Sequence, residues 1–348
     1  MRFFDAHCDT ILKVVQEGAD FAAGHDTHVT LPGMVEAGIG VQVFAVWALE
    51  SRLGAQVDES AMLMVETVAA LCSEHPDQLM LARSFVEIEQ AFSPEGVIAA
   101  IVSLEGADPL KGDPSALKRF FDAGVRLVTL AWDDNTFSGS ALGSGSGLTA
   151  KGQDLVESCN ELGVVVDVSH ASDTAFWDVC SVSRKPFTAS HSNCRSVCPH
   201  PRNLTDEMIR ALAERGGVMG INLYPGFLSP DFAAHEMRVR NDSFRSVDAG
   251  AMTFDEAGKA ISAVVASLPR PPLSLLVDHV RHATNVGGED CVGLGGDLDG
   301  IDSLPAGLDS VADYPRIEDL LRDAGFAPAL VEKVCYRNFT RLFREALA

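Results

Sequence analysis

Eight short runs of β-branched and other apolar residues recur along the chain and alternate with segments of amphipathic, helical periodicity. Each run is apolar at nearly every position, which is typical of strands buried on both faces, as in a parallel sheet. The runs are Phe3–His7, Val41–Trp47, Val97–Leu104, Val125–Trp132, Val164–Ser169, Pro186–His191, Val218–Tyr224 and Cys291–Asp297. Eight strand–helix units in 348 residues predict an α/β fold of the (β/α)8 type, a TIM-like barrel. A doubly wound open sheet is the alternative.

The segments between the runs carry helix start and stop signals. Asp113 stands before Pro114 at a predicted helix start, and Gly124 follows the apolar positions of that segment. Thr205 opens another such segment, and Gly216 ends it. These signals support a single barrel domain over residues 1–348.

One segment, at about residues 228–272, is the least regular part of the chain. It lies between the seventh and eighth runs and is longer than one crossover helix requires. A loop at this place would lie over the catalytic face of a barrel, so we expect either a lid or an insertion with an extra helix.

The charge balance limits the partners. There are 27 Lys and Arg against 49 Asp and Glu, a net charge of −22. Such a surface repels phosphate backbones and anionic lipid, so we expect no nucleic-acid or membrane partner. The apolar stretches are shorter than the roughly 20 residues of a membrane-spanning helix, and the first ten residues contain no apolar signal segment. The eight cysteines show no disulfide-scaffold spacing, which predicts a cytoplasmic protein.

Polar, titratable residues follow five of the eight runs. They are His7, Asp9, Glu105, His170, His191 and Asp297. Any one of them alone is more readily explained as a hydrogen-bonded structural residue. In a barrel, however, the carboxyl ends of all strands meet at one face, where catalytic residues gather. Three of the ten histidines and three acids at that face predict a metal-dependent hydrolase, because imidazole nitrogen and carboxylate oxygen suit zinc.

A site with two metal ions needs a carboxylate between them, because divalent ions about 3.5–4 Å apart repel each other strongly. Glu105 is the candidate for this bridge. His7 and Asp9 would complete one zinc ion, and His170 and His191 the other, giving two Zn²⁺ per chain. Asp297 would then accept the proton of the attacking water and pass it to the leaving group, so Asp297 and Glu105 are the predicted catalytic residues.

Six segments resemble, in order, the signature segments of the membrane dipeptidase (renal-dipeptidase-like) metallopeptidase family. They are DAHCDT, SLEGAD, DVSH, ASHSN, CPHPRNLTDE and GLGGDLDG, and the resemblance extends from Phe4 to about Asn338. It implies an amidohydrolase-type (β/α)8 barrel, a binuclear zinc site, hydrolysis of dipeptides and a homodimer. It also implies the ligand division given above, Asp297 as the acid/base group, and Arg202 as the anchor of the substrate's terminal carboxylate.

Three further residues are candidates for substrate binding. A planar guanidinium pairs with a carboxylate through two hydrogen bonds, which supports the role of Arg202 on its chemistry alone. The family usually has a histidine after the fourth strand, whereas this chain has Trp132, which cannot be protonated to stabilise an oxyanion. Trp132 is therefore interpreted as a wall of the pocket. Tyr224 is either a pocket residue or an aromatic residue of the core.

The favoured function is a zinc-dependent dipeptidase. The alternative enzyme is a metal-dependent amidohydrolase that acts on N-acyl amino acids, lactams or lactones. Arg202 separates the two only in part, because N-acyl amino acids also end in a carboxylate. A third reading, a binding protein with a degraded site, is disfavoured because clustered charges are costly in a cleft without metal.

Overall fold

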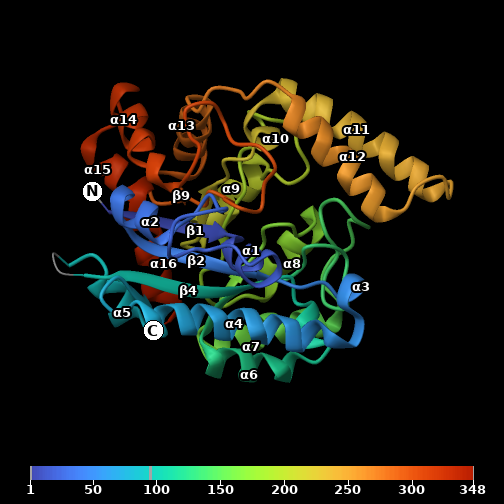
Figure 1. Cartoon of the computed structure of the whole chain (residues 1–348), viewed down its shortest axis with the longest axis horizontal. Helices are drawn as coiled ribbons and strands as arrows, with labels where there is room; N and C mark the ends of the chain where they lie inside the picture. Colours follow the sequence, from blue (N-terminus) through green and yellow to red (C-terminus); the bar gives the residue numbers. More distant parts are fainter. Residues whose placement is uncertain (1, 94–95, 348) are drawn as a thin grey trace.

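The computed structural model describes residues 2–93 and 96–347, and its centre is a closed barrel of parallel strands (Figure 1). Within those residues eight strands form the barrel: β1 (Phe3–Cys8), β2 (Ile39–Trp47), β4 (Ile98–Glu105), β5 (Val125–Thr129), β6 (Val165–Asp167), β7 (Thr188–Ala189), β8 (Val218–Ile221) and β9 (Val292–Leu294). The barrel closes because β9 pairs with β1, where Asp5 lies opposite Leu294, and β2 pairs with β4. The predicted (β/α)8 barrel is confirmed, and the open sheet is wrong.

The strands are shorter than the apolar runs that predicted them, and one strand was not predicted. β7 pairs over only Thr188 and Ala189, although the run continues to His191. Beyond these pairs, backbone groups bind side chains instead: the amides of Ser169 and Ser190 both donate to Asp167 Oδ1, each at 2.9 Å. The additional strand β3 (Leu79–Leu81) pairs with the start of β4.

An apolar plug closes the amino end of the barrel. The helix α16 (Asn338–Ala346) lies across this end and packs Phe339 and Phe343 against Phe4 of β1, with ring centroids 5.3 and 5.4 Å apart. These rings belong to one buried cluster with Val41 and other inward-facing strand residues. Because this end is filled with apolar side chains, the polar site lies at the opposite, carboxyl end.

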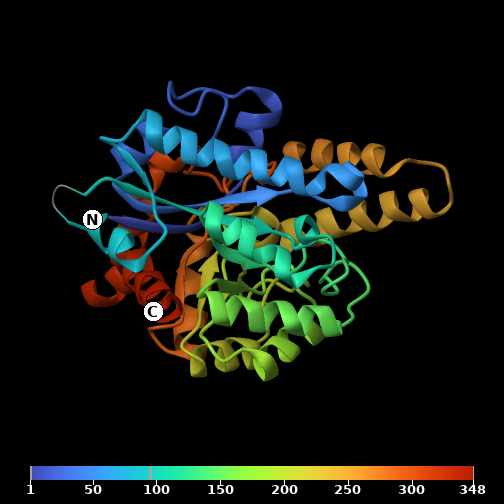
Figure 2. The ribbon, with the colours of Figure 1, turned by 90° about the horizontal axis from the view of Figure 1, so that it is seen from below.

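Helices surround the barrel, as Figures 1 and 2 show from two directions. They include α1 (Thr10–Glu17), α4 (Val57–Glu74), α6 (Leu117–Ala123), α7 (Ala150–Leu162), α8 (Asp173–Val182), α9 (Asp206–Glu214), α13 (Leu275–Gly287) and α14 (Pro315–Asp323). The predicted caps are present: Thr205 accepts a hydrogen bond from the amide of Met208 at 3.3 Å, and α6 ends at Gly124. In the described part of the chain, no helix has the length and apolar character that crossing a bilayer would require.

The segment at about 228–272 is a hairpin of two packed helices, α11 (Pro230–Asp248) and α12 (Phe254–Ser267). The hairpin extends outward from the barrel and follows the short helix α10 (Pro225–Leu228) (Figures 1 and 2). It has a small core of its own, made by Tyr224, Phe227, Phe232, Ile261 and Val265. A role as a lid stays a prediction.

Candidate metal centre

The predicted ligands lie together at the carboxyl end of the barrel. His7 belongs to β1, and Asp9 follows that strand at the start of α1. His7 Nε2 lies 3.4 Å from Asp9 Oδ2, 3.5 Å from Glu105 Oε1 and 3.9 Å from Asp297 Oδ1. Four groups from three strand ends therefore face one point, as the sequence predicts.

Glu105 is the centre of this cluster. As the last residue of β4, it places Oε1 3.1 Å from His170 Nε2, 3.7 Å from His191 Nε2 and 3.5 Å from His7 Nε2. The two other histidines also face each other, with 2.9 Å between His170 Nε2 and His191 Nε2. One carboxylate oxygen is thus common to all three imidazoles, which is the arrangement expected of a bridging ligand.

The backbone at two of these positions has a left-handed conformation. His170 has φ 69° and Asp297 has φ 60°, which non-glycine residues rarely adopt. Each such residue costs about 1–2 kcal/mol. Both follow short strands, β6 and β9, and the turn directs each side chain back to the cluster. Local strain of this kind is typical of functional sites.

Gly300 permits the close packing of the loop after β9. A Cβ atom at this position would collide with the carboxylate of Asp9 and would approach Asp297 Oδ1 to 2.6 Å. Only glycine lets the backbone lie directly against two of the acids. The last residue of the GLGGDLDG segment is therefore glycine because a larger residue would not fit there.

Asp167, which the sequence analysis did not single out, orients His191. Its Oδ2 accepts hydrogen bonds from Thr129 Oγ1 at 2.7 Å and from Ser190 Oγ at 2.6 Å. Ser190 Oγ also lies 2.8 Å from His191 Nδ1. Because the serine proton goes to Asp167, His191 must donate from Nδ1, and its Nε2 then presents a lone pair to the cluster. Such support of a ligand by a carboxylate is common at metal sites.

Burial and mutual repulsion raise the pKa values of the acids in the cluster. Burial raises the pKa of Asp9 to about 7, and the neighbouring charge of Glu105 adds to this effect. Burial and the charges of Asp9 and Glu105 raise the pKa of Asp297 to about 8, although His7 opposes the shift. Burial lowers the pKa of His7, but the charges of Glu105 and Asp9 outweigh it and raise that pKa well above its ordinary value. Without a metal ion, Asp9, Asp297 and His7 therefore all bind protons more tightly than they would in water.

The residues present fit divalent metal ions. Neither ring nitrogen of the buried His7 has a hydrogen-bond partner among the described residues. Burial lowers the pKa values of His170 and His191 well below the ordinary value, so both are neutral imidazoles, the form that binds metal. Two groups of ligand atoms have the spacing of a metal site: His7, Glu105 and His191, and His7, Asp9 and Asp297. A metal ion at this place would bind the unpartnered Nε2 of His7, which faces the cluster, and neutralise the acids.

Arg202 lies beside the cluster, in the loop between β7 and α9. Its side chain is buried, and within the described residues Nε and one terminal nitrogen have no hydrogen-bond partner. The guanidinium carbon lies 5.4 Å from the ring centre of Phe227, and the positive charge lowers the pKa values of His170 and His191. Burial lowers the pKa of Arg202 itself to about 10, so it stays charged at neutral pH. Buried, unused donors of this kind suit an anion.

Trp132 and Tyr224 lie in different surroundings. Trp132 is half-buried, and its ring lies 5.7 Å from that of His170 and 5.3 Å from that of Trp47. It therefore borders the cluster, where a pocket wall is predicted. Tyr224 is buried in the small core beneath the helical hairpin, where its ring lies 5.0 Å from that of Phe227. Phe227 contacts both Tyr224 and Arg202.

Asn222 is a second residue that sequence reasoning missed. It follows β8, and its Nδ2 donates to Asp297 Oδ2 at 2.8 Å. Its Oδ1 accepts a hydrogen bond from the backbone amide of Tyr224 at 2.7 Å, which fixes the direction of the side chain. The only signal in the sequence was a polar residue within an apolar run. Asp299 is directed elsewhere, because its carboxylate accepts from Thr10 Oγ1 at 2.6 Å.

A closed (β/α)8 barrel with three histidines and three acids at one buried point defines the class of metal-dependent hydrolase barrels. The family described as membrane dipeptidase, peptidase family M19, matches residues 1–348, and the chain belongs to this family. The family resemblance expected from the six sequence segments is confirmed.

Individual relatives agree with this assignment. A protein of Klebsiella pneumoniae, described as lying in the pqqA 5′ region, is 34% identical over 282 residues, which are 79% of this chain and 91% of that protein. An uncharacterized dipeptidase of Schizosaccharomyces pombe is 32% identical over 71% of this chain, which spans only 53% of that relative. The solved structure of dipeptidase AC, a metallopeptidase of family M19, has a TM-score of 0.84 and 25% identity over 100% of this chain and 99% of its own.

Proposed function

We propose that this chain is a zinc-dependent dipeptidase. The observation that carries the proposal is the position of Arg202, a buried guanidinium with unused donors beside a cluster of metal-binding side chains. The cluster supplies hydrolytic chemistry, and the guanidinium supplies a fixed point for a terminal carboxylate close to it. A substrate held this way presents its last peptide bond to the cluster.

Five residues would hold two zinc ions. Glu105 would bridge them, with His7 and Asp9 completing one set and His170 and His191 the other. The common position of Glu105 Oε1 among the three imidazoles supports the bridge. The division is supported by the 3.4 Å between His7 Nε2 and Asp9 Oδ2 and the 2.9 Å between His170 Nε2 and His191 Nε2. Bound zinc would polarise the scissile carbonyl and lower the pKa of water towards neutrality.

Asp297 would move the proton. Asn222 occupies its Oδ2 at 2.8 Å, whereas Oδ1 faces the cluster, 3.9 Å from His7 Nε2. Oδ1 would accept a proton from the attacking water and deliver it to the nitrogen of the leaving amine, so that one water molecule is consumed per bond cleaved. The hydrogen bond from Asn222 keeps the other oxygen out of this exchange.

A second candidate function is supported by one observation. The rings of Trp132 and Trp47 form an edge-to-face pair beside His170, and such an apolar wall also suits the acyl chain of an N-acyl amino acid. Arg202 would hold the carboxylate of that substrate equally well. The two functions differ at the other end of the substrate, where a dipeptide carries a free amine.

The test is a double cycle on substrate and protein. Wild type and Arg202→Met are each assayed on a free-acid dipeptide, its amide and an N-acyl amino acid. Loss of a charge-assisted, two-point contact corresponds to roughly 2–4 kcal/mol, or about 30- to 1,000-fold in kcat/KM for the amide. In Arg202→Met this penalty should largely disappear, because the substitution removes the other half of the same contact. An undiminished penalty would show that Arg202 does not bind the carboxylate.

A further inference from the structure

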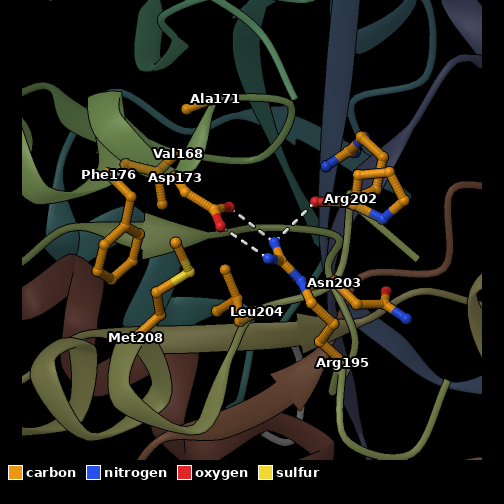
Figure 3. Close-up of a pocket in the computed structure, with 10 residues that line it drawn as sticks. Val168, Ala171, Asp173, Phe176, Arg195, Arg202, Asn203, Leu204 and Met208 are labelled. Carbon is orange, nitrogen blue, oxygen red and sulfur yellow. Dashed lines mark hydrogen bonds and ion pairs between the residues drawn. The ribbon is translucent and has the colours of Figure 1, made fainter. Parts of the chain in front are cut away.

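Arg195 makes an unusual set of contacts around the backbone of Arg202. Its two terminal nitrogens donate to the two carboxylate oxygens of Asp173, each at 2.7 Å. Its Nε donates to the carbonyl of Asn203 at 2.7 Å, and a terminal nitrogen donates to the carbonyl of Pro201 at 2.9 Å. Figure 3 shows the guanidinium between Asp173 and this backbone.

The two carbonyls that Arg195 binds belong to the residues directly before and after Arg202. The amide of Arg202 is held as well, by His200 Nδ1 at 3.1 Å. The backbone of Arg202 is therefore fixed on both sides, whereas its Nε and one terminal nitrogen are unpartnered within the described residues. The position of the guanidinium consequently depends on the backbone that carries it and on its contact with Phe227.

Asp173 links this loop to the metal centre. It is the first residue of α8 and lies three residues after His170. The side chain of Asp173 is 52% exposed and that of Arg195 is 26% exposed. An isolated exposed ion pair contributes about 0–1 kcal/mol to stability, so general stability gives little reason for this arrangement. A two-point ion pair combined with two carbonyl contacts does, however, define a position well.

We infer that Arg195 is a positioning residue, which, through Asp173, keeps Arg202 at a fixed position relative to the metal centre. The inference rests on the proposed function, in which Arg202 binds the terminal carboxylate. Loss of Arg195 should therefore weaken the binding of substrates that carry this carboxylate. Substrates without it, and the metal centre itself, should be affected little.

The experiment measures kcat and KM of the zinc-loaded protein on a free-acid dipeptide and its amide. Arg195→Met should raise KM for the free acid about 10- to 100-fold, the effect expected of an anchor displaced by about 1 Å, while kcat/KM for the amide and zinc content stay near wild type. Arg195→Lys should raise KM for the free acid nearly as much as Arg195→Met, because an ammonium cannot bind the carboxylate and both carbonyls at once. Arg210→Met, which alters an exposed ion pair with Glu207 on α9, is the matched control and should leave kcat and KM for both substrates unchanged.

Combination with Arg202→Met separates this inference from the proposed function. If Arg202→Met abolishes the preference for the free acid, adding Arg195→Met should have no further effect on that preference. If Arg202→Met leaves the preference intact, the proposed function fails. The positioning role is wrong if Arg202→Met abolishes the preference but Arg195→Met leaves it unchanged. It is also wrong if Arg195→Met lowers kcat/KM equally for both substrates. Asp173→Asn, which alters an exposed carboxylate, should give the same substrate-selective change at smaller size and serves where Arg195→Met does not fold.

Discussion

The role of Asp297 can be tested with a pair of substitutions whose sizes follow from its contacts. Asp297→Asn keeps the shape of the side chain but removes the oxygen that can carry a proton. A positioned acid/base group contributes about 10²–10⁴-fold to turnover, or about 2.7–5.4 kcal/mol of the barrier. We therefore expect kcat to fall by this factor while zinc content stays that of wild type.

Asn222→Ala should give a smaller, dependent effect. It removes the 2.8 Å hydrogen bond to Asp297 Oδ2. A hydrogen bond to a charged group contributes about 1.5–3 kcal/mol, which sets an upper limit of about 10- to 150-fold on the loss of kcat. In the Asp297→Asn background the same substitution should add little, because both residues act through one carboxylate.

The assay is steady-state hydrolysis of a free-acid dipeptide, with zinc content and melting temperature measured on each variant. Asp299→Asn is the matched control. Asp299 is also buried and has a left-handed backbone conformation, but its carboxylate is directed to Thr10 and the amide of His28. It should lower the melting temperature and retain kcat. Near-normal turnover of zinc-loaded Asp297→Asn would refute the proton-transfer role.

Two further predictions concern the metal centre. Gly300→Ala should lower zinc content and activity together, because its Cβ would collide with Asp9. The control Gly258→Ala on α12, where a Cβ meets nothing within 4 Å, should lower neither. Equal zinc content in the two variants would show that the collision does not disturb the metal centre. In the metal-free protein, Asp9 and Asp297 keep protons up to a pKa of about 7 and about 8, above the value of 3.8 expected in the unfolded chain, so the stability that these protons provide is lost as pH rises. The melting temperature of the chelator-treated protein should therefore fall as pH rises from about 5 to about 8 and level off above that, and a rise over this interval would contradict the assignment.

The fold could be predicted because the barrel imposes a simple pattern on the sequence. Strands such as β4 are buried on both faces, so the run Val97–Leu104 is apolar at nearly every position. Strand ends could not be predicted, because they depend on which residues of neighbouring strands pair. The run Pro186–His191, for example, contributes only Thr188 and Ala189 to the sheet. The strand β3 has three residues and no distinctive pattern.

The ligand candidates were visible in the sequence because their chemistry and their places after apolar runs coincide. The residues that orient them were not. Asn222 contacts Asp297 across 75 residues, and Asp167 reaches Ser190 across 23 residues. Arg195 binds the backbone on both sides of Arg202. Such roles are defined by contacts between distant segments, and an asparagine, an aspartate or an arginine in a loop does not reveal its partner.

The bridging role of Glu105 can be tested through the zinc content of purified wild type and Glu105→Gln, measured by elemental analysis on protein of known concentration. We propose that Glu105 Oε1, which lies 3.1–3.7 Å from three histidine nitrogens, serves two metal ions at once. We expect two zinc ions per wild-type chain and the loss of both in Glu105→Gln, since one bridging charge holds them together. One ion lost and the other fully retained would contradict the bridge.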